Sequence, residues 1–256
     1  MDSAIDVVGR VSVLLRTLSA HEPAGATTTV IARAAGLARP TAHRLLSSMR
    51  SEGLTDRDDA SGKWHLGPEI YLLGLVASAR HDATDIARST VRRVARETGE
   101  SAFFSARRGD ETVCLLREDG SFPIRSHVLY EGIRFPLGVA SAGLAILSFL
   151  DTREQTEYLR DTDLATVYGD AHHRDRLTDQ IGRTRRMGYA VNPGLIVPGS
   201  WGIGAAVFDR EGSPRWALSI TGVEARLTPP RQQQIGKLLL SEAHALSQRI
   251  SEHGRA

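Results

Sequence analysis

The sequence predicts an α+β protein in which a winged helix-turn-helix is joined by a linker helix to a larger α+β domain with a mostly antiparallel sheet. Between Thr27 and Asp56, apolar residues recur at helical spacing on either side of a glycine. Gly67-Pro68 then interrupts the pattern. Beyond residue 100, short apolar stretches alternate with turn sequences such as RRGDE and DREGSP, as in antiparallel strands. We therefore expect domains at residues 1–66 and 82–256, with the linker helix at 67–81.

The N-terminal part begins with a predicted helix over residues 5–19, which the loop HEPAGA ends. A second helix starts near Thr27, a suitable N-cap residue, and stops at Gly36, where a left-handed backbone is expected. A third helix follows, with Pro40 in its first turn. The last two helices share a face of small or apolar residues: Ile31, Ala34, Ala35, Leu37, Ala42, Leu45, Leu46 and Met49. Extended pieces at 54–57 and 63–66 flank the turn DDASG and form a predicted wing.

The charged residues of the two predicted helices in this motif are basic. The formal net charge of the whole chain is only +2, so a nucleic-acid surface would have to be a local patch. No acidic residue lies between Glu22 and Glu52, a stretch that holds Arg33, Arg39, Arg44 and Arg50. Two short helices with an acid-free basic face are suited to a phosphate-lined groove. The motif therefore predicts DNA binding.

The rest of the chain alternates between helical and extended patterns. A linker helix is expected over 69–80 and a further helix over 85–98. Strands are expected at 101–107, 112–118, 124–130, 203–208 and 215–221. Helices are expected at 141–149, 153–160, 175–187 and 230–251. This order indicates an antiparallel sheet flanked by helices.

Composition excludes several classes of protein. The single cysteine, Cys114, rules out an internal disulfide framework and a cluster of cysteine ligands, and its apolar surroundings in TVCLL indicate a buried thiol. No apolar run approaches the length of a membrane span, and the first residues do not resemble a signal peptide. We expect a cytoplasmic protein without a cofactor or metal.

Several segments together resemble the IclR family of bacterial transcriptional regulators. They are IARAAGLARPTAHRLLSSM, EGL and WHLGPEI in the first part, and FPLGVASAGLAILS, RRMGYAVN, GIGAAVFDREG and WALSITG in the second. Each is weak alone, but their order and spacing are specific. The resemblance implies a homodimer or dimer of dimers that binds a palindromic or repeated operator. It also implies a GAF/PAS-like C-terminal domain that binds a small metabolite, commonly an organic or aromatic acid.

The second helix of the motif supplies the candidate DNA-reading residues. With its apolar residues buried, its outward face carries Arg39, Pro40, Thr41, His43, Arg44 and Ser48. Arg44 is suited to guanine, and Thr41 to a phosphate or a thymine methyl group. Arg57 and Lys63 on the wing would contact phosphate or the minor groove, although Asp56, Asp58 and Asp59 beside them weaken that surface.

Candidate ligand residues lie in the C-terminal part. Backbone N–H groups of Ser141 and Ala142 at a helix start could hold a carboxylate, or the small residues there could simply permit tight packing. Ser219 and Thr221 alternate along a strand, so their hydroxyls share a face and need partners. The family resemblance implies the pocket residues Ile124, His127, Phe135, Ser141, Ala142, Asn192, Ser200, Gly202, Ser219 and Thr221.

The same region departs from the family. Relatives often carry acidic residues near Val197 and at Asn192, and a cysteine at Gly202, whereas NPGLIVPGSWG here has no charge. The substitutions favour an apolar ligand, with Ile124, Phe135 and Trp201 as candidate walls. We therefore expect an aromatic or otherwise apolar carboxylate.

Two other functions remain open at this point. A constitutive DNA-binding regulator would fill the pocket with its own side chains. An enzyme is the more distant alternative, because GSWG and ASAG would need glycine at Pro198 or Val139 to form a nucleophile elbow. The adjacent His172 and His173 lack nearby ligand partners at metal-binding spacing. Repression and activation are both compatible with the sequence.

Overall fold

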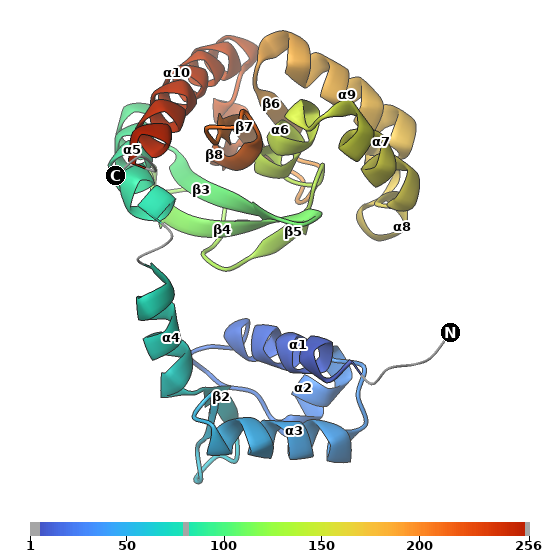
Figure 1. Ribbon diagram of the computed structural model, residues 1–256. Helices are drawn as coiled ribbons and strands as arrows, with labels where there is room; N and C mark the ends of the chain where they lie inside the picture. Colours follow the sequence, from blue (N-terminus) through green and yellow to red (C-terminus); the bar gives the residue numbers. More distant parts are fainter. Residues whose placement is uncertain (1–5, 79–81, 254–256) are drawn as a thin grey trace. The chain divides into compact units, whose positions relative to one another are not determined.

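The computed structural model describes residues 6–78 and 82–253 (Figure 1). The chain divides into two compact units, Met1–His81 and Asp82–Ala256. The expected start of the first helix at residue 5 and the expected end of the linker helix at residue 80 lie outside the described residues. Within the described residues, no helix is both long enough and apolar enough to cross a membrane.

The N-terminal unit is a winged helix-turn-helix. Its elements are α1 (Val7–Ser19), α2 (Thr28–Ala34), α3 (Arg39–Ser51), an antiparallel pair of strands β1 (Thr55–Arg57) and β2 (Trp64–Leu66), and α4 (Pro68–Ser78). Thr27 caps α2 by accepting from the N–H of Val30 at 3.4 Å. Gly36 follows α2 at φ 62°, a left-handed conformation that glycine adopts without strain. The predicted turn between the helices is therefore present.

The core of this unit joins helices α1, α2 and α3 to the wing. Its buried residues are Leu14, Leu18, Ala26, Ile31, Ala32, Ala42, Leu46, Met49 and Trp64. Trp64 comes from β2 and is only 1% exposed. Its indole N–H donates to Thr28 Oγ1 at 2.9 Å. The wing is consequently packed into the same core as the helix pair.

The C-terminal unit is built on a six-stranded antiparallel sheet with strand order β5-β4-β3-β8-β7-β6. The strands are β3 (Ser101–Arg108), β4 (Glu111–Glu118), β5 (Arg134–Pro136), β6 (Ala190–Pro193), β7 (Ser200–Phe208) and β8 (Pro214–Val223). The helices are α5 (Asp82–Thr98), α6 (Ser141–Phe149), α7 (Thr152–Asp161), α8 (Ala165–Tyr168), α9 (Arg174–Met187) and α10 (Pro229–His253). Short 3₁₀ turns lie at Asp170–His172 and Glu224–Arg226.

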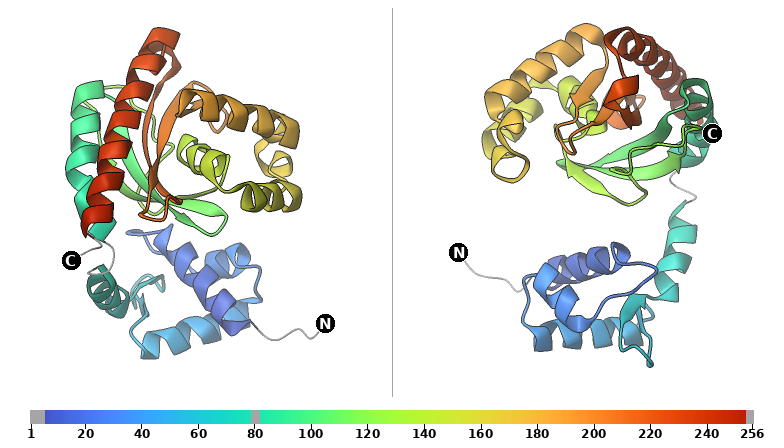
Figure 2. Two further views of the ribbon diagram at one scale, coloured as in Figure 1. Left: turned by 45° about the horizontal axis from the view of Figure 1, so that its top comes forward. Right: turned by 180° about the vertical axis from the view of Figure 1, so that it is seen from behind.

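Helices cover both faces of the sheet (Figure 2). On one face, α5 and α10 bury Val91, Leu239 and Leu246 against Phe104 and other strand residues. On the other face, α6 packs with α7 and α9, and its core includes Leu144 and Ile146. The two cores are separate clusters, one on each side of the strands. This layering is the predicted α+β architecture.

One predicted strand is absent, and two observed strands were not predicted. Residues 124–130 do not form a strand: the chain between β4 and β5 has no regular secondary structure, and the carbonyl of Ile124 accepts a hydrogen bond from the Arg226 side chain instead of from a neighbouring strand. Tertiary contacts override the local alternation there. The short edge strands β5 and β6 were not predicted, because they have only three and four residues and each ends at a proline.

Candidate DNA-binding helix and buried cavity

Helix α3 has one buried and one exposed face. Ala42, Leu46 and Met49 are buried against the core of the N-terminal unit. Of the predicted DNA-reading residues of α3, Thr41 is half-buried and the rest are exposed: Arg39, Pro40, His43, Arg44 and Ser48. The spacing of the apolar residues therefore sets which side chains can reach a groove.

The exposed face of α3 carries free positive charge near its start. In the described parts of the chain, neither Arg39 nor Arg44 forms an ion pair, whereas Arg50 lies 3.9 Å from both Asp56 and Asp59. No side chain caps the N-terminus of α3. Unsatisfied backbone N–H groups and unpaired guanidinium groups both favour a phosphate or base acceptor.

Among the described residues, the basic side chains of the wing, unlike Arg39 and Arg44, make contacts within the protein. The Nζ of Lys63 donates to the carbonyl of Ala24 at 3.0 Å, and the Arg57 guanidinium lies 5.4 Å from the centre of the Trp64 ring. Asp58 accepts from the backbone N–H of Ser61 at 2.6 Å, which lowers the pKa of that carboxyl and keeps it negative. These contacts make the wing the weaker part of a DNA surface.

His43 has a second role in packing. Its ring meets the Trp64 ring edge-on, with centroids 5.9 Å apart and an interplanar angle of 80°. Such a contact holds the middle of α3 against β2. A change at His43 would therefore disturb the helix–wing junction as well as any contact with DNA.

In the C-terminal unit, several candidate ligand residues are paired with one another across neighbouring strands, and together they form one register row of the sheet. Ser101 pairs with Thr221, Thr221 with Gly202, and Gly202 with Asn192. The three side chains of this row are at most 6% exposed. Since paired residues in neighbouring strands project to the same face, the row forms a polar floor beneath α6.

Helix α6 lies very close to this floor. A Cβ placed on Gly202 would lie 2.9 Å from Ser141 Oγ, and one on Gly204 would lie 2.8 Å from the Ser141 carbonyl oxygen. No side chain caps the start of α6 at Ala140. The small residues therefore do permit tight packing, and the helix start also borders the polar row.

A small cavity lies between the row and the start of α6. It is lined by Val128, Leu129, Ala140, Ser141, Asn192, Ile196, Ser200, Trp201, Gly202 and Thr221, none of which is charged. It leaves about 20 Å³ accessible to water-sized molecules. Among the described residues, the buried hydroxyls of Thr221 and the neighbouring Ser219 have no hydrogen-bond partner. Buried hydroxyls normally have hydrogen-bond partners, so these two groups are available to bond to a bound molecule.

Only part of the expected ligand set lines the cavity. Ser141, Asn192, Ser200, Gly202 and Thr221 do so. Ser219 lies in the next register row, opposite Phe103 and Gly204. Ala142 packs in the core between α6 and the sheet, and Phe135 packs against that core from β5.

Ile124 and His127 face away from the cavity. Ile124 is 70% exposed, and His127 is exposed with its Nδ1 3.5 Å from a nitrogen of the Arg117 guanidinium. Their neighbours Val128 and Leu129 line the cavity instead, and nothing in the local sequence distinguishes the two pairs. Ile196 was missed as well, because it lies in the irregular stretch between β6 and β7.

The adjacent histidines His172 and His173 lie immediately before α9. His172 is buried, and its Nδ1 donates to the carbonyl oxygen of Tyr168 at 3.0 Å. Within residues 6–78 and 82–253, no group of three or more His, Cys, Asp or Glu side chains is placed to hold a metal ion.

Two family descriptions match this chain. "IclR helix-turn-helix domain" matches residues 7–59, and "Bacterial transcriptional regulator IclR C-terminal" matches residues 76–248. The chain belongs to the IclR family. It is thus similar to transcriptional regulators that combine a DNA-binding helix-turn-helix with a C-terminal ligand-binding domain.

Individual IclR-family proteins resemble the chain over most of its length. The HTH-type transcriptional regulator KipR of Bacillus subtilis is 28% identical over 240 residues, covering 93% of this chain and 95% of its own. The HTH-type transcriptional repressor AllR of Escherichia coli is 28% identical over 211 residues, covering 81% of this chain and 76% of its own.

Solved IclR-family structures share the fold. An IclR homolog from Microbacterium hydrocarbonoxydans, crystallised with 4-hydroxybenzoate, has a TM-score of 0.78 at 23% identity, covering 96% of this chain and all of its own. A regulator from Alicyclobacillus acidocaldarius has a TM-score of 0.81 at 24% identity, covering 96% and 99%. At these identities the likeness establishes the architecture alone.

Proposed function

We propose that this IclR-family regulator reads its operator with the exposed face of α3 and that a small organic acid, aromatic or otherwise apolar, modulates the binding. Arg39, Thr41, Arg44 and Ser48 would contact bases and nearby phosphates, and Arg57 and Lys63 would contact phosphate from the wing. The unpaired guanidinium groups of Arg39 and Arg44 carry this assignment.

The effector would bind in the cavity beneath α6. The unpartnered buried hydroxyls of Ser219 and Thr221 are the observation that carries this proposal. A carboxylate would be placed near the N-terminus of α6, where the backbone N–H of Ser141 and the helix dipole favour negative charge. Val128, Leu129 and Ile196 would contact the apolar part of the molecule, whereas Trp201 borders the cavity from β7 but packs against the core on the α5 and α10 side of the sheet.

Isothermal titration calorimetry with a panel of aromatic and aliphatic carboxylates, starting with 4-hydroxybenzoate, tests the effector. We expect one of these acids to bind the wild-type protein and to bind Thr221→Val about tenfold or more weakly, because that variant loses a hydroxyl donor at constant shape. Ser148→Ala is the matched control, since Ser148 is a buried serine at the other end of α6. The absence of heat with every acid would reject this effector class.

A regulator without an effector is the second candidate, and the size of the cavity favours it. About 20 Å³ is enough for roughly one water molecule, so the side chains of the protein itself fill the site. The two candidates differ in thermal unfolding. A bound effector raises the melting temperature with its concentration, whereas an effector-free regulator shows no such dependence.

We also propose that the working form is a homodimer or a dimer of dimers. Helix α4 exposes an apolar surface that includes Tyr71 (68%), Leu72 (52%), Leu73 (53%) and Val76 (73%). Helices that are apolar all round are normally buried, so a second copy is the natural cover. Pairing also places two α3 helices for two half-sites of an operator. Sedimentation velocity on wild type and on Leu72→Lys tests the assembly, because the added charge should shift it toward monomer.

A further inference from the structure

The cavity is closed on one side by a segment without regular secondary structure. Residues 119–133, the β4–β5 segment, connect those two edge-side strands and supply Val128 and Leu129 to the cavity lining. Loops of this length inside a compact domain are uncommon and often act as lids over a site. The other linings belong mainly to β6, β7, β8 and the start of α6.

The cavity must enlarge before it can hold an organic ligand. Its volume of about 20 Å³ is far below the roughly 300–1,000 Å³ of ligand pockets. Hydrogen-bonded pairing of β7 with β8 fixes the floor of the cavity. Helix α6 already lies in close contact with Gly204, so it cannot move toward the sheet. The irregular stretch that carries Ile196 is short and is tied by hydrogen bonds from the Leu195 N–H to Asn192 Oδ1 and from the Ser200 N–H to the Val197 carbonyl. The longer β4–β5 segment is therefore the wall that can yield.

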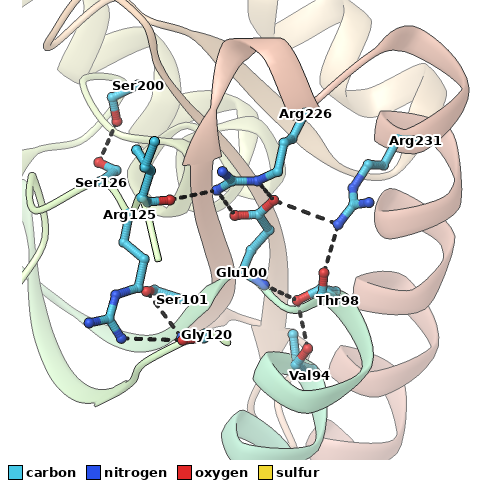
Figure 3. Close-up of polar contacts among 11 residues, drawn as sticks. Val94, Thr98, Glu100, Ser101, Gly120, Arg125, Ser126, Ser200, Arg226 and Arg231 are labelled. Atoms are coloured by element: carbon cyan, nitrogen blue, oxygen red, sulfur yellow. Dashed lines mark hydrogen bonds and ion pairs between the residues drawn. The ribbon is translucent and has the colours of Figure 1, made fainter. Parts of the chain in front are cut away.

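One arginine fixes the middle of this segment. Arg226 donates from Nε and from a terminal nitrogen to the two carboxylate oxygens of Glu100, at 2.8 and 2.6 Å. The same terminal nitrogen donates to the Ile124 carbonyl at 3.1 Å. Figure 3 shows the guanidinium between the carboxylate and the segment. Glu100 is only 1% exposed, so it anchors Arg226 from inside the domain.

Further contacts hold the segment on either side of Ile124. The Arg226 guanidinium lies 4.3 Å from the centre of the Phe122 ring, and that of Arg231 lies 5.6 Å from it. The hydroxyls of Ser126 and Ser200 are 2.5 Å apart (Figure 3). Ser200 also lines the cavity. An effector that engaged Ser200 would therefore compete with one of the contacts that keep the segment closed.

We propose that the β4–β5 segment is the gate of the effector cavity and that Arg226, anchored by Glu100, is the positioning residue that sets how often the gate opens. The identity of what enters rests on the proposed effector function. The gate itself is a property of the protein alone. It can therefore be tested in the absence of any ligand.

The only cysteine of the chain reports on this gate. Cys114 is 3% exposed and packs against Leu129 of the segment. Its backbone also exchanges hydrogen bonds with the end of the segment, at 3.0 Å with Ile133 and 2.8 Å with Gly132. A thiol reagent can reach Cys114 when this cover lifts, so the rate of labelling measures opening.

The experiment compares labelling of Cys114 by methyl methanethiosulfonate in full-length variants without ligand. Arg226→Lys keeps a positive charge beside Glu100 but lacks the planar fork that reaches both the carboxylate and Ile124. We expect labelling to become about tenfold faster, which corresponds to one lost charge-assisted hydrogen bond, while the thermal unfolding midpoint falls by no more than it does in Arg93→Lys. Ser126→Ala, a milder change away from the buried carboxylate, should speed labelling about threefold to tenfold.

Arg93→Lys is the matched control, because Arg93 makes the same type of forked contact with Glu242 between α5 and α10. Its labelling rate should equal that of the wild type. Unchanged labelling in both Arg226→Lys and Ser126→Ala would overturn the gate, as would equal acceleration in Arg93→Lys. If labelling follows the expectation but none of the acids binds, the gate stands and the proposed effector class fails.

Discussion

The indole N–H of Trp64 donates to the hydroxyl of Thr28 across the core of the N-terminal unit. Trp64 belongs to the wing and Thr28 to the first turn of α2, so this hydrogen bond, together with the one from the Thr55 hydroxyl to the Leu46 carbonyl, links the two parts of the motif. Lys63, next to Trp64 in the chain, is thereby held on the same rigid body as α3. A DNA surface made from both parts depends on this junction.

Thr28→Val should destabilise the N-terminal unit. The variant keeps the shape of the side chain but leaves the indole N–H of Trp64 buried without an acceptor, which costs about 1–3 kcal/mol. Urea unfolding followed by tryptophan fluorescence measures the change. Thr29→Val is the control, because Thr29 is exposed and should change stability little. Equal stabilities of the two variants would show that the hydrogen bond contributes nothing.

Arg44→Ala should abolish the shift of operator DNA in a mobility-shift assay while oligomeric state and effector binding stay normal. An exposed arginine that bonds to a base contributes about 1–3 kcal/mol per half-site, and a dimer loses two such contacts. Arg50→Ala should cost less, because Arg50 already lies near Asp56 and Asp59. Wild-type affinity in Arg44→Ala would remove Arg44 from the interface.

Lys63→Ala should weaken binding to all DNA sequences alike. Lys63 is expected to contact phosphate, so its loss should lower the slope of log affinity against log salt by about 1. The Nζ must first leave the Ala24 carbonyl, which limits the gain from the contact. Fluorescence anisotropy at several salt concentrations, with operator and unrelated DNA, gives both quantities. A loss confined to the operator would mean that Lys63 reads bases.

The stability of the C-terminal unit should fall at alkaline pH because of Cys114. Burial raises the pKa of this thiol from 9.0 to about 12. A folded-state pKa above the unfolded one gives stability that is complete below pH 9.0 and is lost as the pH rises toward about 12. Within that window the free energy of unfolding should decrease by up to about 1.4 kcal/mol per pH unit. Cys114→Ala should show a shallower slope in urea unfolding, and an equal slope would contradict the assignment.

The helix-turn-helix could be predicted in detail because its signals are local. Gly36 requires a left-handed backbone, Pro40 fits a first helical turn, and the apolar period of α3 fixes its buried face. After residue 100 the longer strands β3, β4, β7 and β8 and their flanking helices were visible in the alternation of patterns, whereas the short strands β5 and β6 were not. Such features depend on a few neighbouring residues, so one sequence is enough to reveal them.

The wall of the cavity could not be predicted, because it depends on contacts between distant residues. Ile124 and Val128 look alike in sequence, yet the hydrogen bond from Arg226 to the Ile124 carbonyl and the packing of Leu129 on Cys114 decide which side chains turn inward. The partnership of Glu100 with Arg226 spans most of the domain sequence. No local pattern encodes a contact of that separation.

If the proposed effector binds beneath α6, the close approach of that helix to Gly202 limits how the cavity could be re-engineered. A Cβ at Gly202 would lie 2.9 Å from Ser141 Oγ, so no larger side chain fits there. Glycine has no side chain to shorten, so no substitution at this position would enlarge the cavity. Directed evolution of a biosensor from this scaffold should therefore randomise Val128, Leu129 and Ile196 rather than the strand row. Shortening those side chains would widen the range of detected compounds while leaving the sheet pairing intact.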